Sequence, residues 1–201
     1  MKLVLMTQPV FFVEEDKILT SLFDEGLDNL HLYKPDSEPI YSERLLSLLA
    51  ENYHKYITVH DNFYLKEEYN LHGIHVDEGV AVPQNYKGHL SRTCTRLEQL
   101  KESKRNADYV MLKYIFDSHA ELIPKASFTL DELKEASRHG LIDRHVYALG
   151  GMNLETIKFA RDLGFGGVVI SGDLWNRFDI HQEKDYKALI EHFGKLRKAV
   201  G

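Results

Sequence analysis

Residues 145–172 constrain the fold of this chain more than any other segment. Two short apolar runs, 146–149 and 167–170, flank a stretch whose apolar residues recur at helical spacing. A parallel pair of strands needs a crossover of this kind, which is almost always right-handed. The segment therefore predicts a strand–helix–strand unit with small residues at the carboxyl ends of both strands.

The same alternation of strand-like and helical patterns extends along the whole chain. We expect strands at 3–6, 29–34, 56–60, 73–76, 87–91, 109–115, 146–149 and 167–170, and helices at 14–25, after an N-cap at Ser42, after Asn62 through Tyr69, and at 95–105, 130–138 and 183–198. Only the connection at 80–86 is too short for a full helix. An open doubly wound sheet is disfavoured, because neither a glycine fingerprint nor a ribose-binding acid follows the first strand. The pattern favours a single α/β domain over residues 1–201, a (β/α)8 TIM barrel with a degenerate connection after strand four.

Composition excludes several classes of function. The 201 residues carry a formal net charge of −6, whereas nucleic-acid binding would need a clustered basic face. The single cysteine, Cys94, excludes an internal disulfide framework and fits a reducing compartment. No apolar run approaches the length of a membrane span, about 18 residues. We expect a cytoplasmic protein without nucleic-acid or membrane partners, in which the aromatic residues Phe11, Phe12 and Trp175 are candidates for an exposed homodimer contact.

Polar side chains gather near the expected carboxyl ends of the strands, where the chemistry of such a barrel takes place. They are His31, Tyr33 and Lys34 on strand two, His60, Asp61 and Asn62 on strand three, His75 and Asp77 on strand four, His89, Ser91 and Arg92 on strand five, and Lys113 and Tyr114 on strand six. Polar residues that interrupt apolar runs at one end of nearly every strand are hard to explain as core. They are the candidate functional site.

Two interpretations compete for the acidic residues of this group. Asp61 and Asp77, on adjacent strands, offer the hard oxygen ligands that Mg²⁺ shares with substrate phosphates. Alternatively, Asp61 caps the following helix and Asp77 accepts hydrogen bonds from its loop.

The histidines and cations of the group also have two interpretations each. His60, His75 and His89 lack zinc-ligand spacing, which favours structural or substrate-contacting roles. Lys34 and Arg92 suit anion binding, or else form ion pairs with nearby acids at the barrel mouth.

The last two strands end in Gly150 and Gly151 and in Ser171 and Gly172. The corresponding loops of barrels of this kind commonly bind a phosphate, since glycines let backbone N–H groups approach an anion. The alternative is that the glycine pair only forms a tight turn.

Seven short motifs follow one another along nearly the whole chain: LYKPD (32–36), VHDNFYL (59–65), GIHVDEG (73–79), HLSRTCT (89–95), DYVMLKYIFDS (108–118), ALGGMNLETI (148–157) and GFGGVVISG (164–172). In this order they resemble the motifs of the thiamine phosphate synthase family and of its close relatives, the thiazole tautomerases. The resemblance implies a barrel that uses Mg²⁺ to join a pyrimidine methyl diphosphate to a thiazole phosphate with loss of diphosphate. Its partners would be these small phosphorylated substrates.

The resemblance also implies roles for individual residues. Lys34 and Ser91 would contact the diphosphate, Asp61 and Asp77 would hold the metal, and Tyr114 stands where the tautomerases carry a histidine. Gly150, Gly151, Ile170 and Ser171 would hold the thiazole phosphate, and the further substrate-binding candidates are His31, His60, Asn62, His75, Arg92 and Gly172.

Three departures from the synthase motifs keep other activities open. Asn62 replaces a second acid, VDEG (76–79) replaces the acidic motif after strand four, and Glu121 stands where a diphosphate-binding lysine is expected, with Lys125 nearby. The alternatives are a metal-independent isomerase like the tautomerases, with Tyr114, His89 or His119 as proton shuttle, and a non-catalytic binder of a thiamine-related phosphate.

Overall fold

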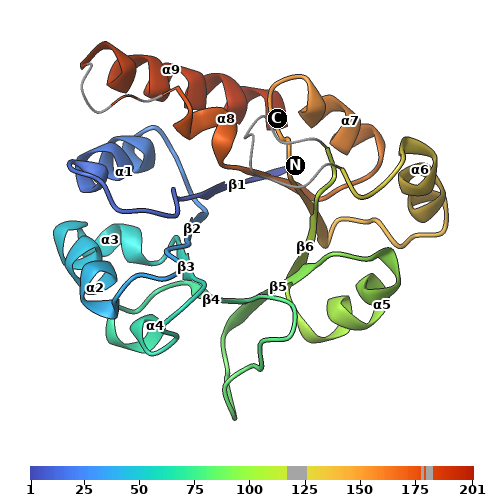
Figure 1. Cartoon of the computed structure of the whole chain (residues 1–201), viewed down its shortest axis with the longest axis horizontal. Helices are drawn as coiled ribbons and strands as arrows, with labels where there is room; N and C mark the ends of the chain where they lie inside the picture. The colour runs from blue at the N-terminus through green and yellow to red at the C-terminus, as the bar shows by residue number, and fades with distance from the viewer. Residues whose placement is uncertain (117–125, 178, 180–182) are drawn as a thin grey trace.

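The computed structural model describes residues 1–116, 126–177, 179 and 183–201 (Figure 1). Eight parallel strands form a closed barrel in sequence order, and the last strand pairs with the first. They are β1 (Lys2–Met6), β2 (Leu30–Leu32), β3 (Ile57–Val59), β4 (Gly73–Val76), β5 (His89–Cys94), β6 (Tyr109–Lys113), β7 (Val146–Leu149) and β8 (Gly167–Ile170). The prediction of an eight-stranded α/β barrel is confirmed.

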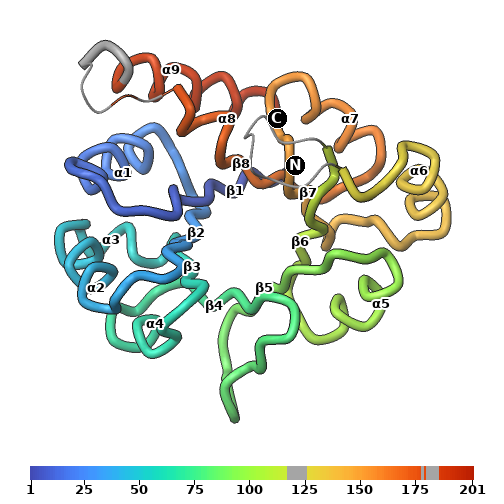
Figure 2. The backbone as a smooth tube through the Cα atoms, viewed as in Figure 1, coloured from blue at the N-terminus to red at the C-terminus, as the bar shows by residue number. Residues whose placement is uncertain are grey.

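Helices surround the barrel (Figures 1 and 2). They are α1 (Glu15–Asp24), α2 (Pro39–Leu48), α3 (Glu51–His54), α4 (Leu65–Glu68), η1 (Leu97–Gln99), α5 (Leu100–Ser103), η2 (Lys104–Asn106), α6 (Leu130–Arg138), α7 (Thr156–Asp162), α8 (Gly172–Trp175) and α9 (Glu183–Val200). No helix occurs between β4 and β5, as expected for the degenerate connection. The long α9 packs against α1, α7, α8 and β1, and the Met1 ammonium donates to the Val200 carbonyl at 3.0 Å. None of the helices in the described ranges combines the length and apolar character that a membrane span requires.

The hydrophobic core has two parts, separated by the alternation of side chains along each strand. In β1, Leu3 and Leu5 pack outward in the main core, whereas Val4 and Met6 point into the barrel. The inner cluster also contains Tyr109, Met111, Tyr147 and Val169. Inward positions on β2, β4 and β5 are polar instead, which places His31, His75 and Ser91 inside the barrel.

The bounds of some helices and strands agree with the predicted ones, and others differ. β4, β7, β8 and α6 have the predicted bounds. The Ser42 cap is wrong: α2 begins three residues earlier, because Pro39 is well suited to the first helical position, and Ser42 is buried within the helix. β5 continues to Cys94, because its register with β6 pairs Cys94 with Leu112.

The expectation that Trp175 is exposed is wrong. The residue is 2% exposed, and its Nε1 donates to the Met6 carbonyl at 2.7 Å. It therefore joins α8 to the end of β1 and is not a surface contact for a homodimer. Phe11 and Phe12 are partly buried against the main core.

Candidate functional site

A pocket of about 890 Å³ lies at the carboxyl ends of the strands. Its walls come from the segment after β1, from strand ends around the barrel and from α8, and they comprise Met6, Thr7, Gln8, Pro9, Tyr33, His60, Asp77, Thr93, Lys113, Tyr114, Leu149, Gly150, Gly151, Met152, Val169, Ser171, Gly172, Asp173, Trp175, Asn176 and Arg177. A volume of this size is typical of a site for a small organic molecule.

The glycine pair after β7 forms one wall of the pocket. Gly150 and Gly151 have φ angles of 111° and 62°, which a side chain would strain. A Cβ on Gly150 would also lie 3.1 Å from the backbone nitrogen of Tyr114. Tyr114 itself has a φ of 68°, a strained conformation for a residue with a side chain. The close approach of these two loops requires the glycine and fixes the shape of this wall.

Residues after β8 complete the same wall. Ser171 and Gly172 both line the pocket. The side chain of Ile170 is fully buried in the main core, so only its backbone is available for the predicted contact. The four small residues predicted to hold a phosphate therefore meet at one side of one pocket.

Acidic side chains lie on the opposite part of the barrel, after β3 and β4. Asp77 lines the pocket. Asp61 does not cap α4, whose N-cap is Tyr64 without a side-chain hydrogen bond. Burial raises the pKa of Asp61, and the negative charges of Asp77 and Asp36 raise it further. Asn62 follows Asp61 with a φ of 51°.

These carboxylates fit a magnesium ion in their chemistry. Oxygen ligands that repel one another are stabilised by a divalent cation, and Mg²⁺ usually binds one or two carboxylates together with water and substrate phosphates. Asp61 and Asp77 would hold such an ion.

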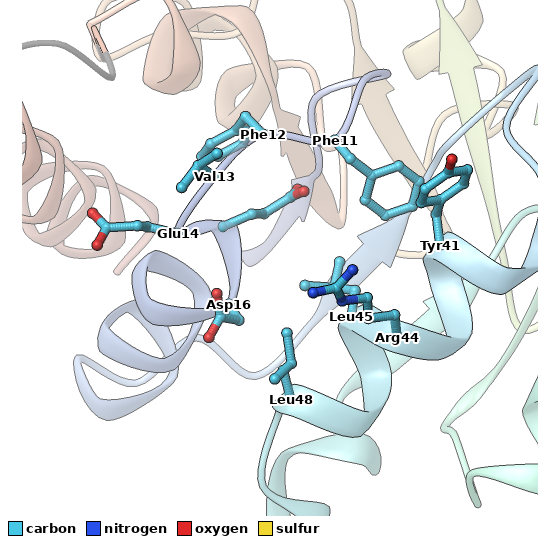
Figure 3. A pocket seen from close by; sticks show the side chains of 10 residues that line it. Phe11, Phe12, Val13, Glu14, Asp16, Tyr41, Arg44, Leu45 and Leu48 are labelled. Atoms are coloured by element: carbon cyan, nitrogen blue, oxygen red, sulfur yellow. The ribbon is translucent and has the colours of Figure 1, made fainter.

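Lys34 lies away from this pocket. Its ammonium contacts both Glu15 oxygens, at 2.6 and 2.9 Å, and donates to the Val10 carbonyl at 2.9 Å. Glu15 lines a separate pocket of about 430 Å³ beside α1 and α2, where Phe11 faces Tyr41 (Figure 3). Of the two interpretations of Lys34, the ion pair describes its position.

Ser91 and Arg92 also differ from the predicted arrangement. Because β5 extends to Cys94, Ser91 lies one pleat below the mouth, fully buried inside the barrel. Arg92 is on the opposite face of the strand, and its buried Nε has no hydrogen-bond partner. Thr93 takes the pocket position instead.

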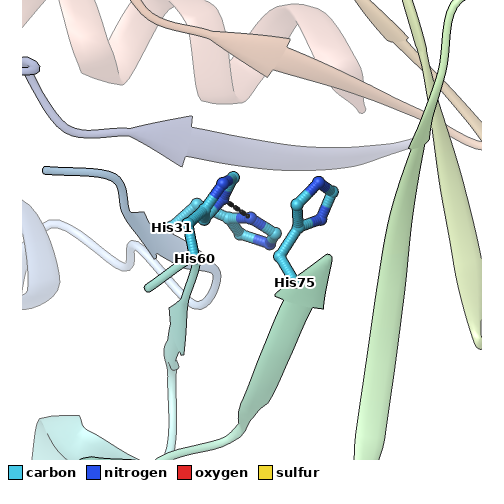
Figure 4. A group of neighbouring side chains, drawn as sticks. All are labelled: His31, His60 and His75. Carbon is cyan, nitrogen blue, oxygen red and sulfur yellow. Dashed lines mark hydrogen bonds between the residues drawn. The ribbon is translucent and has the colours of Figure 1, made fainter. Parts of the chain in front are cut away.

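Three histidines from β2, β3 and β4 meet inside the barrel (Figure 4). His31 Nδ1 lies 2.8 Å from His60 Nε2, and the His60 ring stacks on His75 at 4.2 Å. His75 contacts Ser91 through Nδ1 and Thr93 through Nε2, both at 2.8 Å. Burial lowers the pKa of each imidazole, so all three are neutral near pH 7.

The register of the strands explains this meeting. Val59 pairs with Ile74, so the next residues, His60 and His75, are neighbours that face inward. His75 pairs with Ser91 in turn. Among the described residues, His31, His60 and His75 are the only three potential metal ligands whose ligand atoms lie within 4.8 Å of one another.

Sequence reasoning missed several pocket residues. Asp173 and Arg177 of the α8 region line the pocket, and so does Trp175, which was expected at the surface. Their positions directly after β8 were the available signal. Tyr109, at the start of β6, was also missed and bonds to His31 inside the barrel. Lys113, identified at the end of strand six, lines the pocket with its ammonium 5.1 Å from the centre of the Tyr114 ring. His119, Glu121 and Lys125 lie outside the described residues.

Solved structures provide a comparison for this fold and pocket. A thiamine phosphate pyrophosphorylase from Bacteroides thetaiotaomicron is 48% identical, with a TM-score of 0.88 over 99% of this chain and 97% of that chain. A thiamine phosphate pyrophosphorylase from Pyrococcus furiosus is 16% identical, with a TM-score of 0.71 over 100% of this chain and 97% of that chain. A 3-hexulose-6-phosphate synthase, 16% identical with a TM-score of 0.65 over the full length of both chains, shares the fold alone. The sequence matches no family model and no curated protein.

Proposed function

Because this chain belongs to the thiamine phosphate synthase family, we propose that it is a transferase that joins hydroxymethylpyrimidine diphosphate to thiazole phosphate, releasing diphosphate. Membership in this family supports a function in thiamine biosynthesis. The match covers 99% of this chain and 97% of that chain, so it spans the strand ends and loops that form the pocket.

The observation that carries the proposal is the pairing of two chemically different walls in one pocket. Gly150, Gly151, Ser171 and Gly172 form a wall of small residues suited to backbone contacts with a phosphate. Asp77 lies in the same pocket, close enough to Asp61 for their charges to interact. A pocket with one wall for a phosphate and another for a metal-bound diphosphate fits two phosphorylated substrates.

In the proposed reaction, the bond between the pyrimidine methylene carbon and the diphosphate oxygen breaks, and its electron pair leaves with the diphosphate. The lone pair of the thiazole nitrogen then forms the new carbon–nitrogen bond. The protein contributes orientation and electrostatics to such a step. Mg²⁺, held by Asp61 and Asp77, would supply charge neutralisation at the leaving diphosphate. Lys113 places a cation in the same pocket.

The test is to incubate the pure protein with both substrates and Mg²⁺ and to measure thiamine phosphate. We expect product that disappears with EDTA and in the Asp77→Asn variant. Asp131→Asn, on the surface of α6, is the matched control and should keep full activity. Absence of product from the wild-type protein would contradict the synthase assignment.

A second candidate is the metal-independent isomerase. The observation that favours it is the position of Lys34, whose ammonium is paired with Glu15 instead of facing a diphosphate. This activity would continue in EDTA, whereas the synthase would stop. Calorimetric binding of thiazole phosphate without turnover of any substrate would instead identify a non-catalytic binder.

A further inference from the structure

The smaller pocket of about 430 Å³ lies outside the barrel, and we call it the α1–α2 groove (Figure 3). Its walls come from α2 and from the segment that leads into α1, and they include Phe11, Val13, Asp16, Tyr41, Arg44 and Leu48. The groove shares no lining residue with the pocket at the carboxyl ends of the strands. The proposed reaction therefore does not account for it.

Large apolar side chains are exposed around the groove. Val10, Val13, Ile40, Tyr41 and Leu48 are each more than half exposed. They are five of the ten large apolar side chains exposed in the described part of the chain, so they are concentrated on one face. Single exposed apolar residues are ordinary, but a contiguous group of them marks an interaction site. Two of the five lie outside the lining of the groove, so a protein surface would cover the group better than a small ligand would.

The spacing of residues along α2 produces part of this face. Tyr41, Arg44, Leu45 and Leu48 recur at intervals of three and four residues, so they lie on one side of the helix. Leu45 is buried against the core, whereas Tyr41 and Leu48 are exposed beside it. The Phe11 ring lies 5.9 Å from the ring of Tyr41. α2 therefore has an outward apolar stripe in addition to its buried face.

Opposite charges stand at the two sides of the groove, Asp16 on α1 and Arg44 on α2 (Figure 3). The two acids before Asp16 have partners, since Glu14 pairs with Lys17 and Glu15 with the buried Lys34. Asp16 and Arg44 take part in none of the ion pairs between described residues. An arginine beside exposed aromatic side chains is typical of a protein interface.

This arrangement of charges is complementary to itself. In a two-fold dimer the same patch of both copies meets, and each contact occurs twice. A two-fold axis through the groove and perpendicular to the surface exchanges its two sides. Arg44 of each copy then faces Asp16 of the other, and the apolar side chains between them are covered. A second copy of this chain therefore supplies the charges that the patch needs, at the places where it needs them.

We propose that the α1–α2 groove is the interface of a two-fold symmetric homodimer. Tyr41 and Leu48 lie at its centre, and reciprocal ion pairs join Arg44 of one copy to Asp16 of the other. Burial of the apolar side chains drives the association, and the ion pairs fix the orientation of the two copies. The proposal does not depend on the chemistry at the barrel mouth.

The first test is the mass of the intact protein in solution. Sedimentation velocity from about 0.1 to about 100 µM should show twice the mass of one chain at the upper concentrations, since association follows mass action. A monomer throughout this range overturns the proposal and would assign the groove to another partner.

The second test places a charge in the apolar centre. Leu48→Glu should weaken dimerisation at least ~10-fold, because the carboxylate loses water at the interface without gaining a partner. Leu48 is exposed in the single chain, so the variant should fold normally, which circular dichroism checks. Leu130→Glu is the matched control, on an exposed leucine of α6 across the barrel, and should leave the dimer intact (Figure 1). A dimer that Leu48→Glu leaves intact uses another face and overturns the proposal.

The third test exchanges the charges. Arg44→Glu brings like charges together twice in each dimer and should weaken dimerisation at least ~10-fold. Combining Arg44→Glu with Asp16→Arg restores the opposite charges in exchanged places, so the double variant should regain most of the affinity. A general disturbance of the surface by either substitution would not be reversed in this way. A double variant that associates as weakly as Arg44→Glu contradicts the reciprocal ion pairs.

Discussion

The ammonium of Lys34 lies 2.6 Å from the carboxylate of Glu15, and each of these side chains is 2% exposed. The ion pair links the start of α1 to the segment after β2. The Lys34 ammonium also lies 4.4 Å from the centre of the Phe11 ring. Lys34 therefore holds the segment that follows β1 in place. The first residues of this segment line the pocket at the carboxyl ends of the strands.

Glu15→Ala should destabilise the protein by about 3–5 kcal/mol, because it leaves the buried Lys34 charge without its partner. Glu15→Gln retains an acceptor for Lys34 and should cost less. Urea denaturation measures both changes. Glu14→Ala removes the exposed pair with Lys17 and is the control, with a much smaller expected effect. Equal effects at Glu14 and Glu15 would refute the role of burial.

The same carboxyl should make stability depend on pH. Burial raises the pKa of Glu15 from 4.5 to about 7, against the opposing charge of Lys34. Between these values the folded state retains a proton that the unfolded state has lost, so the stability contributed by Glu15 falls as pH rises from 4.5 to about 7 and is constant above. The difference in unfolding free energy between wild type and Glu15→Gln, measured by urea denaturation across this range, should show the decrease. An increase of this difference with pH would mean that the charge of Lys34 affects the pKa of Glu15 more strongly than burial does.

Gly150→Ala should destabilise the protein by about 1–3 kcal/mol, because the new side chain is strained by the positive φ and meets the Tyr114 backbone. Gly194→Ala is the matched control. A Cβ there meets nothing within 4 Å, and alanine within α9 should stabilise the protein by about 0.5–1 kcal/mol. Thermal denaturation of both variants checks the opposite signs. Shifts of the same sign would contradict the close approach at Gly150.

Ser171→Asp should weaken binding of a phosphate ligand by at least ~10-fold, because it places a negative charge in the wall proposed for the anion. Aspartate is tolerated at a helix N-cap, so the variant should fold normally. Ser171→Asn has a similar size without the charge and should retain most of the affinity. Calorimetry with thiazole phosphate distinguishes them, and equal losses in the two variants would indicate a steric effect.

Trp175, the single tryptophan of the chain, should report ligand binding. Its ring lines the pocket and its Nε1 donates to Met6, so an occupied pocket changes its surroundings. We expect thiazole phosphate to change the intrinsic fluorescence with the saturation behaviour found by calorimetry. The signal should disappear in Trp175→Phe. A spectrum unaffected by bound ligand would place the ligand away from α8.

Much of the barrel could be predicted because hydrophobic periodicity is a local property. β4, β7 and β8 follow short apolar runs bounded by turn residues, and their predicted bounds are confirmed. The end of β5 could not be predicted in this way. The segment around the predicted end of this strand has polar residues on both faces, Ser91 and Thr93 on one and Arg92 on the other, so it shows no amphipathic alternation. Only pairing with β4 and β6 places Ser91 inside the barrel and Thr93 at the mouth.

The sequence alone determined the alternation of strands and helices, the missing helix after β4, and the small residues after β7 and β8, since each depends on neighbouring residues. The tertiary structure decided which polar residues meet. The Lys34 ammonium pairs with the Glu15 carboxylate, because a buried charge requires a partner. His31, His60 and His75 met because register gave all three the same inward face, a relation between residues on separate strands that no local pattern contains.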